Sequence, residues 1–166
     1  MATITFKGDK LQTFGELPST GTEAPDFTLT GTDLSDVKLS DYKGKKVILN
    51  IFPSLDTSVC ATSVRKFNEK ATKLDDTVVI CISKDLPFAH SRFCSTEGIK
   101  NVINASQYKD EKFGNTYGVT MNTGPLAGLF SRAIVTVDKN GKVVYTEQVP
   151  EIGQEPDYDK AIESVE

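Results

Sequence analysis

The chain has 166 residues, a length that suits one domain with a full hydrophobic core. Its net charge of −4, from 19 basic and 23 acidic residues, argues against a general binder of nucleic acid or anionic membranes. No apolar run approaches the roughly 18 residues that cross a bilayer, and the N-terminus, MATITFKGDK, lacks the pattern of a signal peptide. We expect one domain over residues 1–166, cytoplasmic, without nucleic acid or membrane partners.

The first third of the chain predicts weak strands followed by one strong strand. Turn residues separate three short β-like segments, at residues 3–6, 11–14 and 26–30. They predict an N-terminal β-hairpin and a further strand. The segment KVILNIF, residues 46–52, is almost entirely apolar. Such a run is typical of a central strand covered on both faces, and Pro53 ends it.

The middle of the chain alternates helix and strand. A helix is expected after Pro53, with Asp56, Thr57 or Ser58 as its N-cap. A second buried strand is predicted over TVVICIS (77–83), and a helix beginning at Pro87 over 87–97.

The last third predicts a short strand near 101–105, a helix near 109–117 and a β-hairpin within 132–149. A helix beginning near Asp157 closes the chain. Strands that alternate with helices and end in a hairpin indicate an α/β fold. The order is that of a thioredoxin-like domain, with a central mixed β-sheet flanked by helices.

Cys60 is the most informative residue, because it falls in the first turn of the helix that follows the strong strand. A helix N-terminus offers unpaired N–H groups and a partial positive charge, which favour the nucleophilic thiolate. Thr57, one turn earlier, is placed to bring its hydroxyl beside the sulfur. The alternative is a small apolar cysteine packed under the helix, with Thr57 as a simple cap.

A family resemblance favours the reactive cysteine. FPSLDTSVC resembles the active-site pattern of peroxiredoxins, in which Pro, Thr and Cys occupy the places of Pro53, Thr57 and Cys60. The longer segments NIFPSLDTSVCATSVRKFNEKA, CISKDLPFAHSRFC and GPLAGLFSRAIVTVD resemble the bacterial thiol peroxidase branch of the atypical two-cysteine peroxiredoxins. Ser54 replaces the Thr of most peroxiredoxins, as it tends to in that branch. The resemblance runs from about residue 3 to the C-terminus.

The resemblance implies an enzyme that reduces hydrogen peroxide and organic hydroperoxides. Cys60 would attack the peroxide, Thr57 and Arg132 would position and polarise it, and Pro53 would shield the sulfur. A guanidinium keeps its charge and can donate to peroxide oxygens as the O–O bond breaks. Without the resemblance, a solvated charge is the commoner state of an arginine at the start of a strand.

Two cysteines compete to resolve the sulfenic acid that forms at Cys60. Cys81 lies in the apolar run VVICIS and is expected to be a buried core residue. Cys94, in the more polar HSRFCSTEG, matches the resolving cysteine of thiol peroxidases and would form a Cys60–Cys94 disulfide. The two lie on separate predicted helices, so both helices are expected to unwind locally.

The resemblance also implies thioredoxin as reductant and a homodimer. For the apolar loop GPLAGLF (124–130) the alternatives are a pocket for the organic part of a substrate, a packed surface turn and a subunit contact. We expect no cofactor, and the cysteine spacings with a single histidine do not form a zinc pattern. That histidine, His90, is interpreted as a surface residue because its neighbours are polar. The rival functions are a general thiol–disulfide oxidoreductase, against which the missing CxxC argues, and a redox-responsive binding protein.

Overall fold

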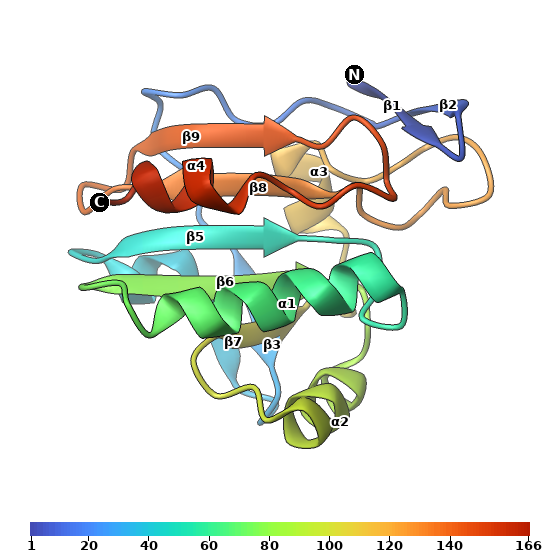
Figure 1. Ribbon diagram of the computed structural model, residues 1–166. Helices are drawn as coiled ribbons and strands as arrows, with labels where there is room; N and C mark the ends of the chain where they lie inside the picture. Colours follow the sequence, from blue (N-terminus) through green and yellow to red (C-terminus); the bar gives the residue numbers. More distant parts are fainter.

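A seven-stranded mixed sheet forms the centre of the computed structural model, which describes residues 1–166 (Figure 1). The strands, in their order across the sheet, are β4 (Asp36–Lys38), β3 (Thr28–Gly31), β7 (Ile103–Ser106), β6 (Thr77–Ser83), β5 (Lys46–Ile51), β8 (Ala133–Val137) and β9 (Val143–Gln148). Strands β5, β6 and β7 are parallel, whereas β8 pairs antiparallel with both β5 and β9. The predicted mixed sheet is therefore present.

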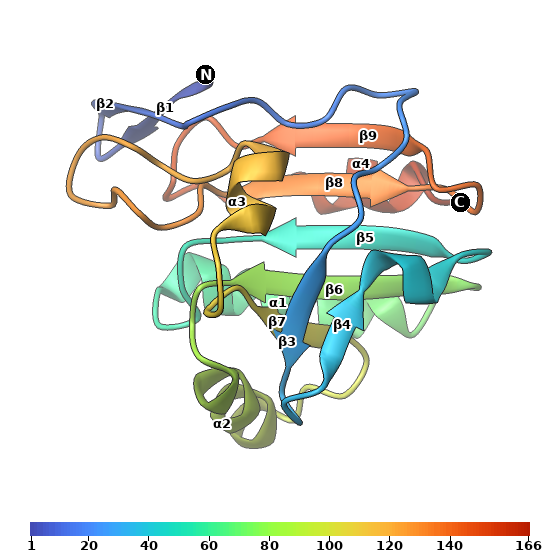
Figure 2. The same cartoon turned by 180° about the vertical axis from the view of Figure 1, so that it is seen from behind.

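Both faces of the sheet are buried, which explains the nearly continuous apolar run of β5. Helices α1 (Ser58–Ala71) and α4 (Tyr158–Glu163) cover one face, and α3 (Lys112–Tyr117) covers the other (Figures 1 and 2). Because side chains alternate along a strand, Ile48 packs toward α1 while Val47 and Leu49 pack toward α3. The two apolar clusters hold the sheet between its helices.

Helix α2 (Pro87–Glu97) packs against β7, beside the end of the sheet at which α1 begins (Figure 1). It begins at Pro87 as predicted, and Gly98 ends it in the left-handed conformation. Its fully buried residues are Pro87 and His90 alone, so α2 contributes few apolar side chains to the core. It is therefore the helix least secured by hydrophobic packing.

The predicted N-terminal hairpin is present as β1 (Thr3–Phe6) and β2 (Asp9–Gln12), which pair antiparallel. It is tied to the segment before α4, because the Thr5 N–H donates to the Pro150 carbonyl (2.8 Å) and the Ile152 N–H donates to the Thr5 carbonyl (2.9 Å). The start of the chain is thus anchored on a segment near its end.

Some boundaries differ from the predicted ones, and two elements were not predicted. The 3₁₀ helix η1 (Leu39–Tyr42) and strand β4 occupy a stretch that lacks a clear period of two or 3.6. Helix α3 begins later than predicted, after Asp110 accepts a hydrogen bond from the Lys112 N–H.

No helix has both the length and the apolar character needed to cross a membrane.

Candidate active site

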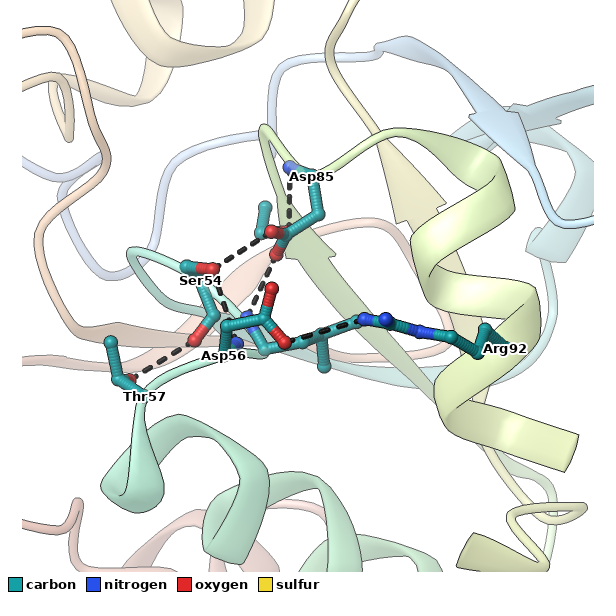
Figure 3. Close-up of polar contacts among 7 residues, drawn as sticks. Ser54, Asp56, Thr57, Asp85 and Arg92 are labelled. Carbon is teal, nitrogen blue, oxygen red and sulfur yellow. Dashed lines mark hydrogen bonds and ion pairs between the residues drawn. The ribbon is translucent and has the colours of Figure 1, made fainter. Parts of the chain in front are cut away.

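The candidate site lies at the carboxyl ends of β5 and β6, because parallel neighbours end at the same edge of a sheet. The loop after β5 leads into α1, and the short turn after β6 leads into α2. Figure 3 shows polar contacts that join these two segments. The topology therefore starts α1, which carries Cys60, and α2, which carries Cys94, at the same pair of strand ends.

Cys60 is the third residue of α1, and its side chain has no exposed surface. Thr57 is the N-cap residue, as one of the predicted candidates, but its side chain forms no capping hydrogen bond. The first N–H groups of the helix therefore keep their positive ends free at the turn that carries the sulfur.

Arg132 immediately precedes β8, and the pairing of Ile51 with Ala133 brings it to the same edge as the end of β5. Its Nη2 lies 3.3 Å from the Cys60 Sγ, and its Nε donates to the Ile152 carbonyl at 3.0 Å. The residue is only 1% exposed, so the alternative of a solvated surface charge is wrong. Its Nη1 is buried and has no hydrogen-bond partner. The charged guanidinium thus lies beside the sulfur and keeps N–H donors that have no hydrogen-bond partner.

The structure places Thr57 and Pro53 on the loop before α1, in different surroundings. Pro53 is buried in a bend just after β5. Thr57 is exposed, and its hydroxyl donates to the Ser54 carbonyl at 3.0 Å (Figure 3). The predicted place of this hydroxyl was beside the sulfur, whereas here it closes a turn within its own loop.

Asp85 organises this loop and was missed by the sequence analysis. Its carboxylate accepts hydrogen bonds from the Ser54 hydroxyl (2.8 Å) and from the Leu55 N–H (2.8 Å), as Figure 3 shows. The usable signal was its position: it is the second residue after the buried strand 77–83, which is parallel to and beside the strand leading to Cys60. Polar side chains that follow adjacent parallel strands meet at one edge.

Cys81 is a fully buried residue of β6, as predicted. The Asn50 side-chain nitrogen lies 3.6 Å from its sulfur. Burial, reinforced by the nearby Cys94, raises the pKa of the Cys81 thiol to about 12. This cysteine is therefore a thiol at neutral pH and is a poor nucleophile.

Cys94 is half-buried on α2 and packs against the apolar cluster that contains Cys60. Burial also raises the pKa of the Cys94 thiol. All three cysteines are free, and Cys60 and Cys94 lie on separate helices, as the sequence predicted. Their pairing stays a prediction.

The interpretation of His90 as a surface residue is wrong. Its side chain is fully buried and contacts Ser83 and Asn104 through its two ring nitrogens. The prediction failed because it weighed only the polar neighbours in sequence. The partners that satisfy the ring lie 7 and 14 residues away.

The apolar loop 124–130 packs beneath the N-terminal hairpin. Leu126 and Leu129 lie against a small cluster with Ile4, Leu11 and Met121. Of the alternatives for this loop, the packed surface turn is the one this arrangement favours. Elsewhere, no group of three or more His, Cys, Asp or Glu side chains is placed to hold a metal ion.

Comparisons with known proteins agree with this architecture. The Redoxin family model matches residues 19–162. A thiol peroxidase of Mycobacterium tuberculosis is 56% identical over 162 residues, which cover 98% of this chain and 97% of the relative. A thiol peroxidase of Corynebacterium glutamicum is 52% identical, with 98% of each chain covered.

Solved structures show the same fold. A peroxiredoxin-like protein of Aquifex aeolicus superimposes with a TM-score of 0.92 at 36% identity, over 98% of this chain and 95% of that one. A thiol peroxidase of Chromobacterium violaceum gives a TM-score of 0.88 at 22% identity, over 95% and 91% of the two chains, and so supports the fold alone. The thioredoxin-like fold predicted from the sequence is confirmed. With a family model that matches most of its length and relatives above half identity, the chain belongs to the redoxin family and to its thiol peroxidase branch.

Proposed function

We propose that the protein is a thiol-dependent peroxidase that reduces hydrogen peroxide and organic hydroperoxides, with Cys60 as its nucleophile. The observation that carries this proposal is the approach of the Arg132 Nη2 to the Cys60 Sγ at 3.3 Å, in the first turn of α1. The names of the relatives, thiol peroxidases of two actinobacteria, support the same reaction. Roles for the remaining residues follow from where each lies.

In the first step the Cys60 thiolate attacks one peroxide oxygen, and the O–O bond breaks. The sulfur becomes a sulfenic acid, and the other oxygen leaves as an alkoxide or hydroxide that takes up a proton. The unpaired Nη1 of Arg132 is a buried donor that can bind the oxygen on which charge develops. Pro53, buried in the bend after β5, shields the sulfur and contributes no N–H of its own, and Thr57 orients the peroxide once its hydroxyl turns toward the sulfur.

Access to Cys60 requires movement of the loop. A side chain without exposed surface is closed even to a water-sized molecule, and hydrogen peroxide is not smaller than water. Leu55 and Pro53 of this loop are buried, whereas Asp56 and Thr57 are exposed, so the end of the loop next to α1 has the least apolar packing to lose when it shifts. The same shift would free the Thr57 hydroxyl from the Ser54 carbonyl.

In the second step the Cys94 thiol attacks the sulfenic acid, giving a Cys60–Cys94 disulfide and one water. Thioredoxin then reduces the disulfide by thiol exchange. The resemblance further supports a homodimer, and the reaction as written uses no other cofactor. We propose that residues 1–166 act as a single thioredoxin-like domain.

The test is peroxide-dependent NADPH oxidation, coupled through thioredoxin and its reductase. It compares the wild type with three variants, in each of which one cysteine is replaced by serine. Cys60→Ser should abolish turnover, because it removes the nucleophile. Cys94→Ser should reduce one equivalent of peroxide and should then show no further turnover with thioredoxin as the reductant. Cys81→Ser, the matched control, should remain active. Loss of turnover in the Cys81 variant alone would overturn the assignment of the second cysteine, and full activity of Cys60→Ser would overturn the proposed function.

A further inference from the structure

A chain of hydrogen bonds, buried at His90 and part-buried at Asp85, joins α2 to the loop before α1. On α2, the His90 Nε2 lies 3.0 Å from the Ser83 Oγ, and the His90 Nδ1 lies 3.1 Å from the Asn104 side-chain nitrogen. The Ser83 hydroxyl in turn lies 2.6 Å from the Asp85 carboxylate. Asp85 holds Ser54 and Leu55 of the loop. The helix that carries Cys94 and the loop that leads to Cys60 are thus connected through the side chains of Ser83 and Asp85.

The direction of each hydrogen bond in this chain can be assigned. A carboxylate only accepts, so the single proton of the Ser83 hydroxyl goes to Asp85. The Ser83 oxygen must then accept from the His90 Nε2, which places the ring proton on that nitrogen. The His90 Nδ1 is left as an acceptor, and the Asn104 amide donates to it. The ring is therefore neutral and satisfied on both sides.

An exposed ion pair runs alongside this chain. The Arg92 Nη2 of α2 lies 3.4 Å from an Asp56 carboxylate oxygen of the loop (Figure 3). Both side chains are largely exposed, so solvent screens the pair and it contributes little. The chain through His90, Ser83 and Asp85 is the stronger connection between the two segments, because its hydrogen bonds are wholly or partly shielded from water and so cost more to break.

We propose that His90, Ser83 and Asp85 form a latch that holds α2, and Cys94 with it, against the loop before Cys60, and that protonation of His90 opens this latch. The inference rests on the proposed function, since release of α2 matters to the reaction only if Cys94 must reach Cys60. Cys94 lies one helical turn after His90, so loss of the histidine contacts loosens the turn that carries the second cysteine.

Protonation opens the latch because it puts a positive charge on a ring that has no exposed surface. It also adds a second N–H at Nδ1, which Asn104 accepts only by turning its amide until the side-chain oxygen, which has no hydrogen-bond partner, faces the ring. Burial lowers the pKa of His90 to about 4, although the Asp85 carboxylate acts in the opposite direction. Asp85 is the charged group that faces the ring, while β6 and β7 present the neutral Ser83 and Asn104.

The other charged pairs of α2 lie elsewhere on the helix. Arg65 of α1 pairs with Glu97 in the last turn at 2.8 Å, and Arg92 pairs with Asp56.

The sign of the pH dependence follows from the two states of α2. In the closed state the pKa of His90 is about 4, and in an opened helix it returns toward its ordinary value of 6.5. The opened state therefore binds more protons between these values, and the closed state is favoured fully only above pH 6.5. We expect the opening equilibrium to rise on the order of tenfold between pH 8 and pH 5.

The first test follows the wild-type protein by NMR. The chain has one histidine, so its imidazole resonances need no assignment by mutation. The His90 resonances should titrate well below pH 6, and amide exchange of residues 87–97, corrected for its intrinsic pH dependence, should lose about tenfold protection by pH 5. Titration near the ordinary value, or protection that does not change with pH, would overturn the latch whether or not a disulfide ever forms.

The second test compares the wild type with His90→Gln, in which the side-chain amide can donate to Ser83 and accept from Asn104 without titrating. Both proteins receive one equivalent of hydrogen peroxide, and disulfide formation is followed by rapid quenching and mass spectrometry. The wild-type rate divided by the variant rate should rise about tenfold from pH 8 to pH 5, because ionisation of Cys94 cancels in the ratio.

The outcomes separate the two proposals. A ratio that stays constant with pH contradicts the latch while leaving Cys94 as the resolving residue. Peroxide consumption without any Cys60–Cys94 disulfide, at any pH, contradicts the proposed function, and the NMR result then decides on the latch alone.

Discussion

The Arg132 Nη2 lies 3.3 Å from the Cys60 Sγ, although 72 residues separate the two in the sequence. Only the pairing of β5 with β8 brings them together, since Ile51 faces Ala133 at the end of that ladder. Strand pairing therefore places the guanidinium beside the sulfur. The N-terminus of α1 is beside the sulfur for a local reason, since Cys60 lies in the first turn of that helix.

Replacing Arg132 by methionine should lower kcat/KM for hydrogen peroxide by about 10²–10³-fold, because a fixed donor at the developing charge is lost. Stopped-flow measurement of Cys60 oxidation checks this. Arg65→Met is the matched control, since Arg65 is exposed and its pair lies between α1 and α2. A loss of less than threefold in Arg132→Met would show that the guanidinium plays no part in peroxide reduction.

Asp85→Asn should slow peroxide reduction about tenfold and lower the free energy of unfolding by about 1–3 kcal/mol, the usual range when a part-buried hydrogen-bonding group loses a partner. The asparagine keeps one acceptor oxygen, so it cannot serve Ser54, Leu55 and Ser83 together. Urea denaturation and the same kinetic assay measure the two effects.

Asp33→Asn is the control for Asp85, because Asp33 accepts bonds from the N–H and hydroxyl of Ser35 in an exposed turn. It should change neither quantity appreciably. If both variants behaved alike, Asp85 would have no special role in positioning the loop.

The reduced protein should show unequal thiol reactivity at pH 8. Cys94 is half-buried, whereas Cys81 is fully buried and its pKa is raised to about 12 by desolvation. In Cys60→Ser, iodoacetamide should modify Cys94 at least tenfold faster than Cys81, since the thiolate is the reacting form. Peptide mapping by mass spectrometry measures both rates. Equal rates would mean that β6 opens as readily as α2.

Glu151 gives a prediction for acid stability. Hydrogen bonds from the Thr5 hydroxyl, and then from the N–H groups of Lys7, Gly153 and Gly8, lower the pKa of Glu151. Its contribution to the free energy of unfolding is therefore complete above its ordinary pKa of 4.5 and is lost as the pH falls below that value.

The measurement compares thermal unfolding of the wild type and Glu151→Gln at pH 7 and pH 3.5. The variant should be less stable at pH 7, and the difference should shrink at pH 3.5. Glu16→Gln is the control, because the Glu16 carboxylate is exposed and its only ion pair, with the N-terminal ammonium, is long at 3.9 Å. A difference that grows toward low pH would contradict the assignment.

Hydrophobic period and turn chemistry predicted most of the sheet. The strand at 77–83 and the helix at 87–97 have the predicted bounds, because a continuous apolar run and a proline at the first helical position are strong local signals. Strand β4 was missed because only Val37 of its three residues is apolar, and no period is visible in so short a segment.

The site was harder to predict where its contacts join distant segments. Cys60 could be found from its place at a helix start. Burial of Arg132 and His90 could not, since their partners lie on distant segments: Cys60 on α1 for Arg132, and Ser83 on β6 for His90. Local polarity suggested exposed side chains at both positions. In a core, a polar residue is identified by the groups that face it, and those depend on the register of the sheet.

The N-terminal strand pair has a practical consequence for anyone who prepares this protein. Thr5 donates to and accepts from the segment 150–152, and the Ile152 carbonyl at the end of that segment accepts from the Arg132 Nε. A start codon moved past Thr5 would remove these contacts from the segment that holds the guanidinium beside the reactive sulfur, and an affinity tag fused at Met1 would lie close to them. The opposite terminus lies at the other end of the strands from the first turn of α1 (Figure 1), so Glu166 is the safer point of fusion for kinetic work.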